Sequence, residues 1–120
     1  MRVLAVGVAL VALIVLGGVA EASAPPVGKL PAAKIVQQTV RHGTLVALAL
    51  PAPKHGNVWR VARPFNAHVA TEVEERTLKS SIVVVYRAKS PGRTSIVYAL
   101  TAGEPSSRAL QALRLELRVT

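Results

Sequence analysis

Apolar and polar side chains alternate along most of the C-terminal two thirds of the chain, the pattern of strands that bury one face. The clearest case is Leu113–Val119, where leucine and valine alternate with charged residues. In Thr44–Leu50, side chains at even positions are expected to share one face and those at odd positions the other. The pattern predicts about seven strands, at Ala33–Val40, Thr44–Leu50, Val58–Ala62, Phe65–Glu74, Ile82–Tyr86, Thr94–Leu100 and Leu113–Val119.

The middle of the chain predicts a central β-hairpin against which the other strands pack. Its first strand is the β-branched and aromatic run Ile82–Tyr86, a composition typical of strands. The sequence Ser90-Pro91-Gly92-Arg93 then predicts a turn, because proline presets φ at the second position and glycine accepts a positive φ at the third. The second strand is Thr94–Leu100.

Short strands separated by Gly/Pro-rich turns, without an amphipathic helix, favour an immunoglobulin-like (Ig-like) antiparallel β-sandwich. We expect residues 34–120 to form this domain. Residues 23–33 are rich in proline and predict an extended linker without a role in the core. Trp59, the only tryptophan, is expected to lie in the core rather than to stack on a ligand.

The first residues resemble a secretory signal peptide. A basic start at Met1-Arg2 is followed by the apolar run Val3–Ala20 and by small residues. Cleavage is expected after Ala22 rather than Ala24, because proline after the scissile bond resists peptidases. The prediction is a signal helix over residues 1–22 and a secreted or periplasmic protein. An uncleaved membrane anchor is the alternative, since 18 apolar residues are at the lower limit for spanning.

The charge of the chain indicates which partners to expect. Fifteen lysines and arginines against six glutamates give a net charge of +9, which favours anionic surfaces or an acidic protein. Nucleic-acid binding is not expected, because four aromatic residues cannot supply stacking platforms between the basic ones.

The sequence predicts neither a metal site nor a cofactor. There is no cysteine, and the spacing of His42, His55 and His68 matches no zinc pattern. Catalysis is not expected either, because the chain has no nucleophile-elbow motif. Glu72 and Glu74 stand close to basic residues and predict a solvated strand face rather than a catalytic carboxylate pair.

Three segments resemble the chagasin-type cysteine protease inhibitors. Gly43–Pro51 is similar to the family's glycine-led strand before its first inhibitory loop, and Gly56–Trp59 keeps the glycine-to-tryptophan spacing after it. Ala88–Tyr98 is similar to the glycine turn and tyrosine-bearing strand that lead to the last loop. The loop sequences depart from the family. Ala52–Gly56 differs from its Asn-Pro-Thr-Thr-Gly run at the first, third and fourth positions, and the Arg-Pro-Trp signature of the last loop is absent.

The resemblance implies a monomeric, secreted inhibitor that inserts three loops into the cleft of a papain-like cysteine peptidase. The loops would be Pro51–Val58, Glu75–Ser81 and Leu100–Ser107. The residues that the resemblance places in contact with the peptidase are Pro53, Lys54, His55, Gly56, Trp59, Thr101, Gly103, Glu104 and Pro105.

The charge leaves a second hypothesis open, a non-inhibitory Ig-like module of the cell envelope. Its partner would be an anionic polymer or an acidic protein, bound by loop lysines or by Arg60, Arg87, Arg114 and Arg118. Such binding is expected to weaken steeply with salt.

Overall fold

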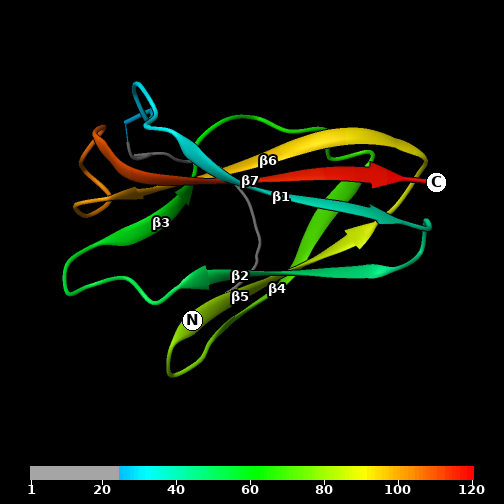
Figure 1. The fold of residues 1–120 in the computed structure, drawn as a ribbon, viewed down its shortest axis with the longest axis horizontal. Coiled ribbons are helices and arrows are strands. Elements are labelled where there is room, and N and C mark those ends of the chain that lie inside the picture. The colour runs from blue at the N-terminus through cyan, green and yellow to red at the C-terminus, as the bar shows by residue number, and fades with distance from the viewer. Residues whose placement is uncertain (1–24) are drawn as a thin grey trace, which may run out of the picture.

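Seven strands make up the computed structural model, which describes residues 25–120 (Figure 1). The predicted signal helix and its cleavage sites lie outside these residues. Within the described range no helix is long and apolar enough to cross a bilayer. The strands are β1 (Ala33–Val40), β2 (Leu45–Pro51), β3 (Val58–Val61), β4 (Ala70–Thr77), β5 (Ser81–Ala88), β6 (Gly92–Thr101) and β7 (Ala109–Val119).

The strands form two facing sheets, in the orders β1-β7-β6-β3 and β2-β5-β4. This confirms the predicted sandwich, and the sheets divide the strands as in Ig domains, apart from the first. The prediction of a wholly antiparallel fold is wrong at one pair. β1 runs parallel to β7, with Ala33 opposite Ala112 and Val40 opposite Val119. A parallel neighbour is possible because these strands lie at opposite ends of the chain and need no tight turn between them.

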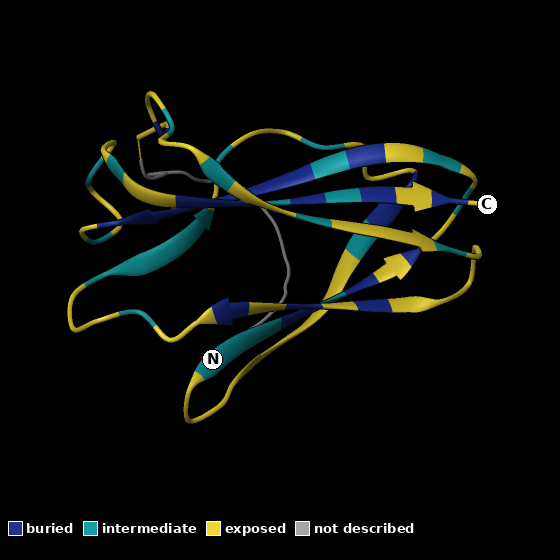
Figure 2. Cartoon of the chain, in the orientation of Figure 1, coloured by how far each residue is buried: buried dark blue, intermediate teal, exposed yellow. Residues whose placement is uncertain are grey.

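The core lies between the sheets and follows the predicted alternation. Along β2, the side chains at 46, 48 and 50 are buried and those between them are exposed (Figure 2). The inner faces of β5, β6 and β7 supply most of the rest. The largest fully buried side chains are Tyr86, Leu50, Ile96, Leu115, Leu117, Val84 and Thr101. Trp59, predicted to lie in the core, packs against this cluster but is only partly buried.

The predicted central hairpin is wrong, because β5 and β6 belong to different sheets. β5 is hydrogen-bonded to β2 and β4, whereas β6 is hydrogen-bonded to β3 and β7. The turn between them carries the chain across the sandwich, and the backbone N–H of Lys89 donates to the carbonyl of Val69 at 2.7 Å. Gly92 has a positive φ of 150°, as its place in the turn predicted. Both strands are central in their own sheets, which explains why both are so apolar.

The strand predicted at Phe65–Glu74 is displaced, since β4 spans Ala70–Thr77. Asn66 prevents an earlier start: its side-chain oxygen accepts from the N–H of His68 at 2.9 Å, and its carbonyl accepts from the N–H of Val69 at 3.1 Å. This turn interrupts a run that alternates in sequence. At its other end β4 continues through charged residues, as edge strands often do. The predicted second loop, Glu75–Ser81, therefore shrinks to the three residues between β4 and β5.

Candidate partner-binding site

Three connections lie together at one end of the sandwich, which we call the loop pole (Figure 1). They are the β2–β3 loop (52–57), the β4–β5 turn (78–80) and the β6–β7 loop (102–108). The N–H of Ala52 donates to the carbonyl of Ser80 at 3.1 Å, which joins the first connection to the second. A Cβ built on Gly103 would lie 3.8 Å from the carbonyl oxygen of Gly56, which places the third beside the first.

The β2–β3 loop is a short turn whose tip is exposed. The N–H of Asn57 donates to the carbonyl of Lys54 at 2.9 Å, and Gly56 has a φ of 86°. Lys54, His55 and Gly56 are all exposed, so three predicted site residues stand at the tip. At the base of the loop, the indole N–H of Trp59 donates to the carbonyl of Pro51 at 2.8 Å. Trp59 thus anchors the loop.

The β6–β7 loop is held by its own hydrogen bonds. The hydroxyl of Thr101 donates to the carbonyl of Gly103 at 2.8 Å, and the N–H of Ser106 donates to the same carbonyl at 3.3 Å. Thr101 is fully buried, so it shapes the loop and offers no surface to a partner. Gly103 is half-buried, while Glu104 and Pro105 are exposed.

The guanidinium of Arg60 on β3 also holds the β6–β7 loop through hydrogen bonds, a role that the sequence did not predict. It donates to the carbonyls of Glu104 at 3.2 Å and Ser106 at 3.0 Å. It also donates to the carbonyl of Pro25 at 2.8 Å. Its Nε is buried without a hydrogen-bond partner among residues 25–120, so only the two terminal nitrogens of the guanidinium make these hydrogen bonds. Charge-assisted bonds of this kind are about twice as strong as neutral ones.

The proline-rich segment, predicted to be an extended linker without a role in the core, is hydrogen-bonded to the same loop and to Arg63. Arg63 donates to the carbonyls of Val27 at 2.9 Å and Gly28 at 2.8 Å. The N–H of Gly28 donates to the carbonyl of Ser107 at 2.8 Å, and the Val27 side chain is only 7% exposed. The start of the described chain thus braces the β6–β7 loop.

A cleft of about 280 Å³ opens at the loop pole between the first loop and the start of β7. Pro53, Lys54, Trp59, Leu100 and Leu110 are among the residues that line it, and the Leu110 side chain is exposed. Leu110 lies where the β6–β7 register shifts between Leu100 and Thr101. The structure therefore brings Pro53, Lys54 and Trp59 to the lining of one cleft. Leu110 was not predicted, because a bulge has no period-2 signal.

The four arginines of the charge hypothesis do not gather on one surface. Arg60 is bonded to backbone carbonyls, and Arg114 lies 3.5 Å from the carboxylate of Glu116. Arg87 belongs to the β2-β5-β4 sheet, whereas Arg118 belongs to the other. Among residues 25–120, no three histidine or carboxylate side chains gather as a metal site would require.

The fold and its loop pole define a small Ig-like β-sandwich domain that presents three connections at one end. No protein-family model matches this sequence, and no curated protein is significantly similar to it. Solved structures share the fold. The cysteine protease inhibitor EhICP2 from Entamoeba histolytica aligns at a TM-score of 0.55 and 15% identity, over 75% of this chain and 99% of its own. PbICP-C, solved in complex with falcipain-2, aligns at a TM-score of 0.58 and 12% identity, over 82% of this chain and 99% of its own.

The likeness to these structures confirms the chagasin-type resemblance at the level of the fold.

Proposed function

We propose that the chain inhibits papain-like cysteine peptidases by inserting its loop pole into the substrate cleft. The observation that carries this proposal is the meeting of three connections at one end of a rigid sandwich. The shared fold supports it, because EhICP2 is a cysteine protease inhibitor and PbICP-C was solved bound to falcipain-2, a papain-like peptidase.

The hydrogen bonds that hold the loop pole and the glycines at its tip support this proposal. Gly56 and Gly103 meet where the first and third loops touch, so no side chains widen the tip there. Trp59 and Arg60 bond the loop backbones to the sheet. Loops fixed before binding lose little conformational entropy on association, which favours affinity. Lys54, His55, Glu104 and Pro105 are the exposed side chains that would meet the cleft wall.

Inhibition of papain by residues 23–120 tests the proposal. We expect an inhibition constant in the nanomolar to low micromolar range, and about a tenfold or greater increase for Lys54→Glu. Lys89→Glu is the matched control, since it changes the same charge on an exposed lysine in the β5–β6 turn, at the other end of β5. Absence of inhibition at micromolar concentrations would refute the function. An equal loss in both variants would show that the loop pole is not the contact surface.

We also propose that the protein is exported and cleaved after Ala22, which the apolar run and the small residues after it support. Mass spectrometry of the protein from the extracytoplasmic fraction should then find Ser23 as the first residue. Recovery of the chain from membranes with Val3–Ala20 still attached would instead identify an anchor.

A further inference from the structure

The outer face of the β1-β7-β6 sheet carries two arginines directly opposite each other. Arg93 of β6 is paired with Arg118 of β7, and Arg118 is paired on its other side with Thr39 of β1. All three residues are exposed. They lie toward the C-terminal ends of β1 and β7, away from the loop pole (Figure 1).

This arrangement costs stability unless an anion occupies it. Like charges directly opposite on neighbouring strands repel each other. Among residues 25–120 the ion pairs are Glu74–Arg76 and Arg114–Glu116, so neither Arg93 nor Arg118 has a carboxylate partner there. Glu116, the acid that lines the groove, already has two partners: Ser95 donates to one of its oxygens at 2.5 Å, and Arg114 is 3.5 Å from the other.

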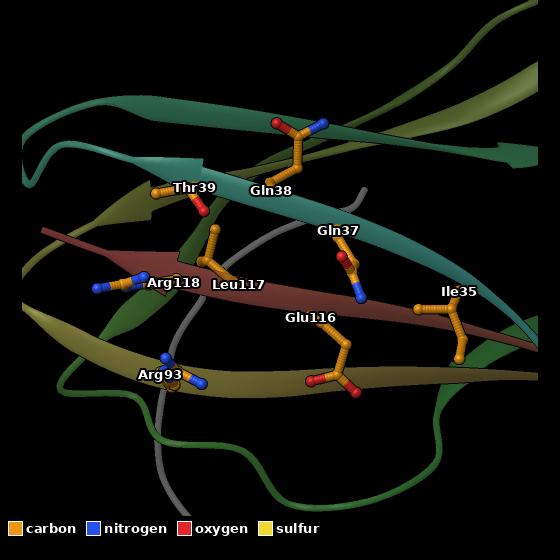
Figure 3. A pocket seen from close by; sticks show the side chains of 8 residues that line it. All are labelled: Ile35, Gln37, Gln38, Thr39, Arg93, Glu116, Leu117 and Arg118. Atoms are coloured by element: carbon orange, nitrogen blue, oxygen red, sulfur yellow. The ribbon is translucent and has the colours of Figure 1, made fainter.

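A groove of about 400 Å³ lies over these residues (Figure 3). Its exposed polar lining includes Gln37 and Thr39 on β1 together with Arg93 and Arg118. Amide, hydroxyl and guanidinium groups are all hydrogen-bond donors, and guanidinium groups bind phosphate oxygens in bidentate pairs. No aromatic side chain lines the groove, so a flat ring would find nothing to stack on.

We propose that this groove, the Arg93–Arg118 site, binds a phosphate-type oxyanion. The anion would lie between the two guanidinium groups, with Thr39 and Gln37 donating from β1. The site is separate from the loop pole, and its loss should leave papain inhibition unchanged.

Phosphate titration of residues 23–120 tests the site, with chloride at matched ionic strength as the reference. We expect amide chemical-shift changes centred on Thr39, Arg93 and Arg118, and a rise in melting temperature with phosphate. Arg93→Gln and Arg118→Gln should each weaken phosphate binding about tenfold, since one charge-assisted interaction is lost. Each should also raise the melting temperature without phosphate, because repulsion across the strands disappears.

Arg87→Gln is the matched control, since it removes an exposed arginine whose strand partners are Leu45 and Thr71. It should bind phosphate like the wild type. Equal weakening in all three variants, or no weakening in Arg93→Gln and Arg118→Gln, would overturn the site. A poly(glycerol phosphate) chain distinguishes the sources of the anion: tighter binding than inorganic phosphate identifies a polymer-borne group, and equal binding identifies the free anion.

Discussion

The phenol oxygens of Tyr86 and Tyr98 lie 2.5 Å apart in the core and form a hydrogen bond between the two sheets. Tyr86 belongs to β5 and Tyr98 to β6, and both side chains are buried. The ring of Phe65 meets that of Tyr86 edge to face, with centroids 5.8 Å apart. One phenol donates to the other, so this single buried hydrogen bond links a strand of each sheet across the core.

Tyr98→Phe should destabilise the domain, because the Tyr86 hydroxyl would remain buried without its partner. We expect a loss of about 1–3 kcal/mol in the free energy of unfolding, measured by urea denaturation. Replacing both tyrosines with phenylalanine should cost less than the sum of the single losses, because no orphaned hydroxyl is left. Additive losses would show that the two hydroxyls do not depend on each other.

Alkaline pH should destabilise the domain through the same pair. Burial, as the largest cause, raises the pKa of both phenols above the ordinary value of 10. The unfolded chain then releases protons above about pH 10 while the folded chain retains them, so folding loses stability as the pH rises. We expect each tyrosine to lower the free energy of unfolding by about 1.4 kcal/mol in total between pH 9 and pH 11, because the unfolded phenol is only half ionised at pH 10. Urea denaturation between pH 9 and pH 11 measures it, and the double phenylalanine variant should lose this slope.

Alternation along the chain was sufficient to predict the two-layer fold. It grouped the side chains at 46, 48 and 50 on one face of a strand, without saying whether that face or the equally apolar opposite one is buried, and the structure shows that it is buried. The pattern of Ala33–Val40 is mixed, yet the strand predicted there is present as β1. It could not identify strand partners, because a hairpin and a crossing between sheets both need two amphipathic or apolar strands around a tight turn. β5 and β6 show this limit, since Tyr86 and Tyr98 face each other across the core instead of side by side in one sheet.

The loop pole was predictable in position but not in construction. Turn residues located the loops, yet the acceptors of Arg60 and Arg63 are backbone carbonyls, which every residue carries and no motif marks. Thr101 was predicted at the peptidase contact and is instead fully buried, because β6 extends to that residue. The pairing of Arg93 with Arg118 could not be predicted from the sequence either, because it depends on the register between β6 and β7.

Gly92→Ala should destabilise the domain more than Gly43→Ala. Both glycines have positive φ, at 150° and 87°, which strains any other residue. A Cβ at Gly92 would also lie 3.0 Å from Cγ2 of Val69, whereas a Cβ at Gly43 meets nothing within 4 Å. We expect the free energy of unfolding to fall by about 1–2 kcal/mol for Gly43→Ala and by about 2–4 kcal/mol for Gly92→Ala, measured by urea denaturation. Equal losses would indicate that backbone strain accounts for both and that the contact with Val69 adds nothing.

Arg60→Gln should loosen the β6–β7 loop while leaving the sandwich folded. The substitution removes charge-assisted bonds to the carbonyls of Glu104 and Ser106, and it releases Pro25. We expect a stability loss of about 1–3 kcal/mol, together with faster amide exchange at Gly28, whose N–H donates to Ser107 of this loop. Arg108→Gln is the control, since Arg108 is exposed in the same loop. If Arg60 holds the loop in the shape needed for insertion, papain inhibition should weaken in Arg60→Gln and remain unchanged in Arg108→Gln. If neither variant changes amide exchange at Gly28 or papain inhibition, the loop keeps its shape without the hydrogen bonds of Arg60.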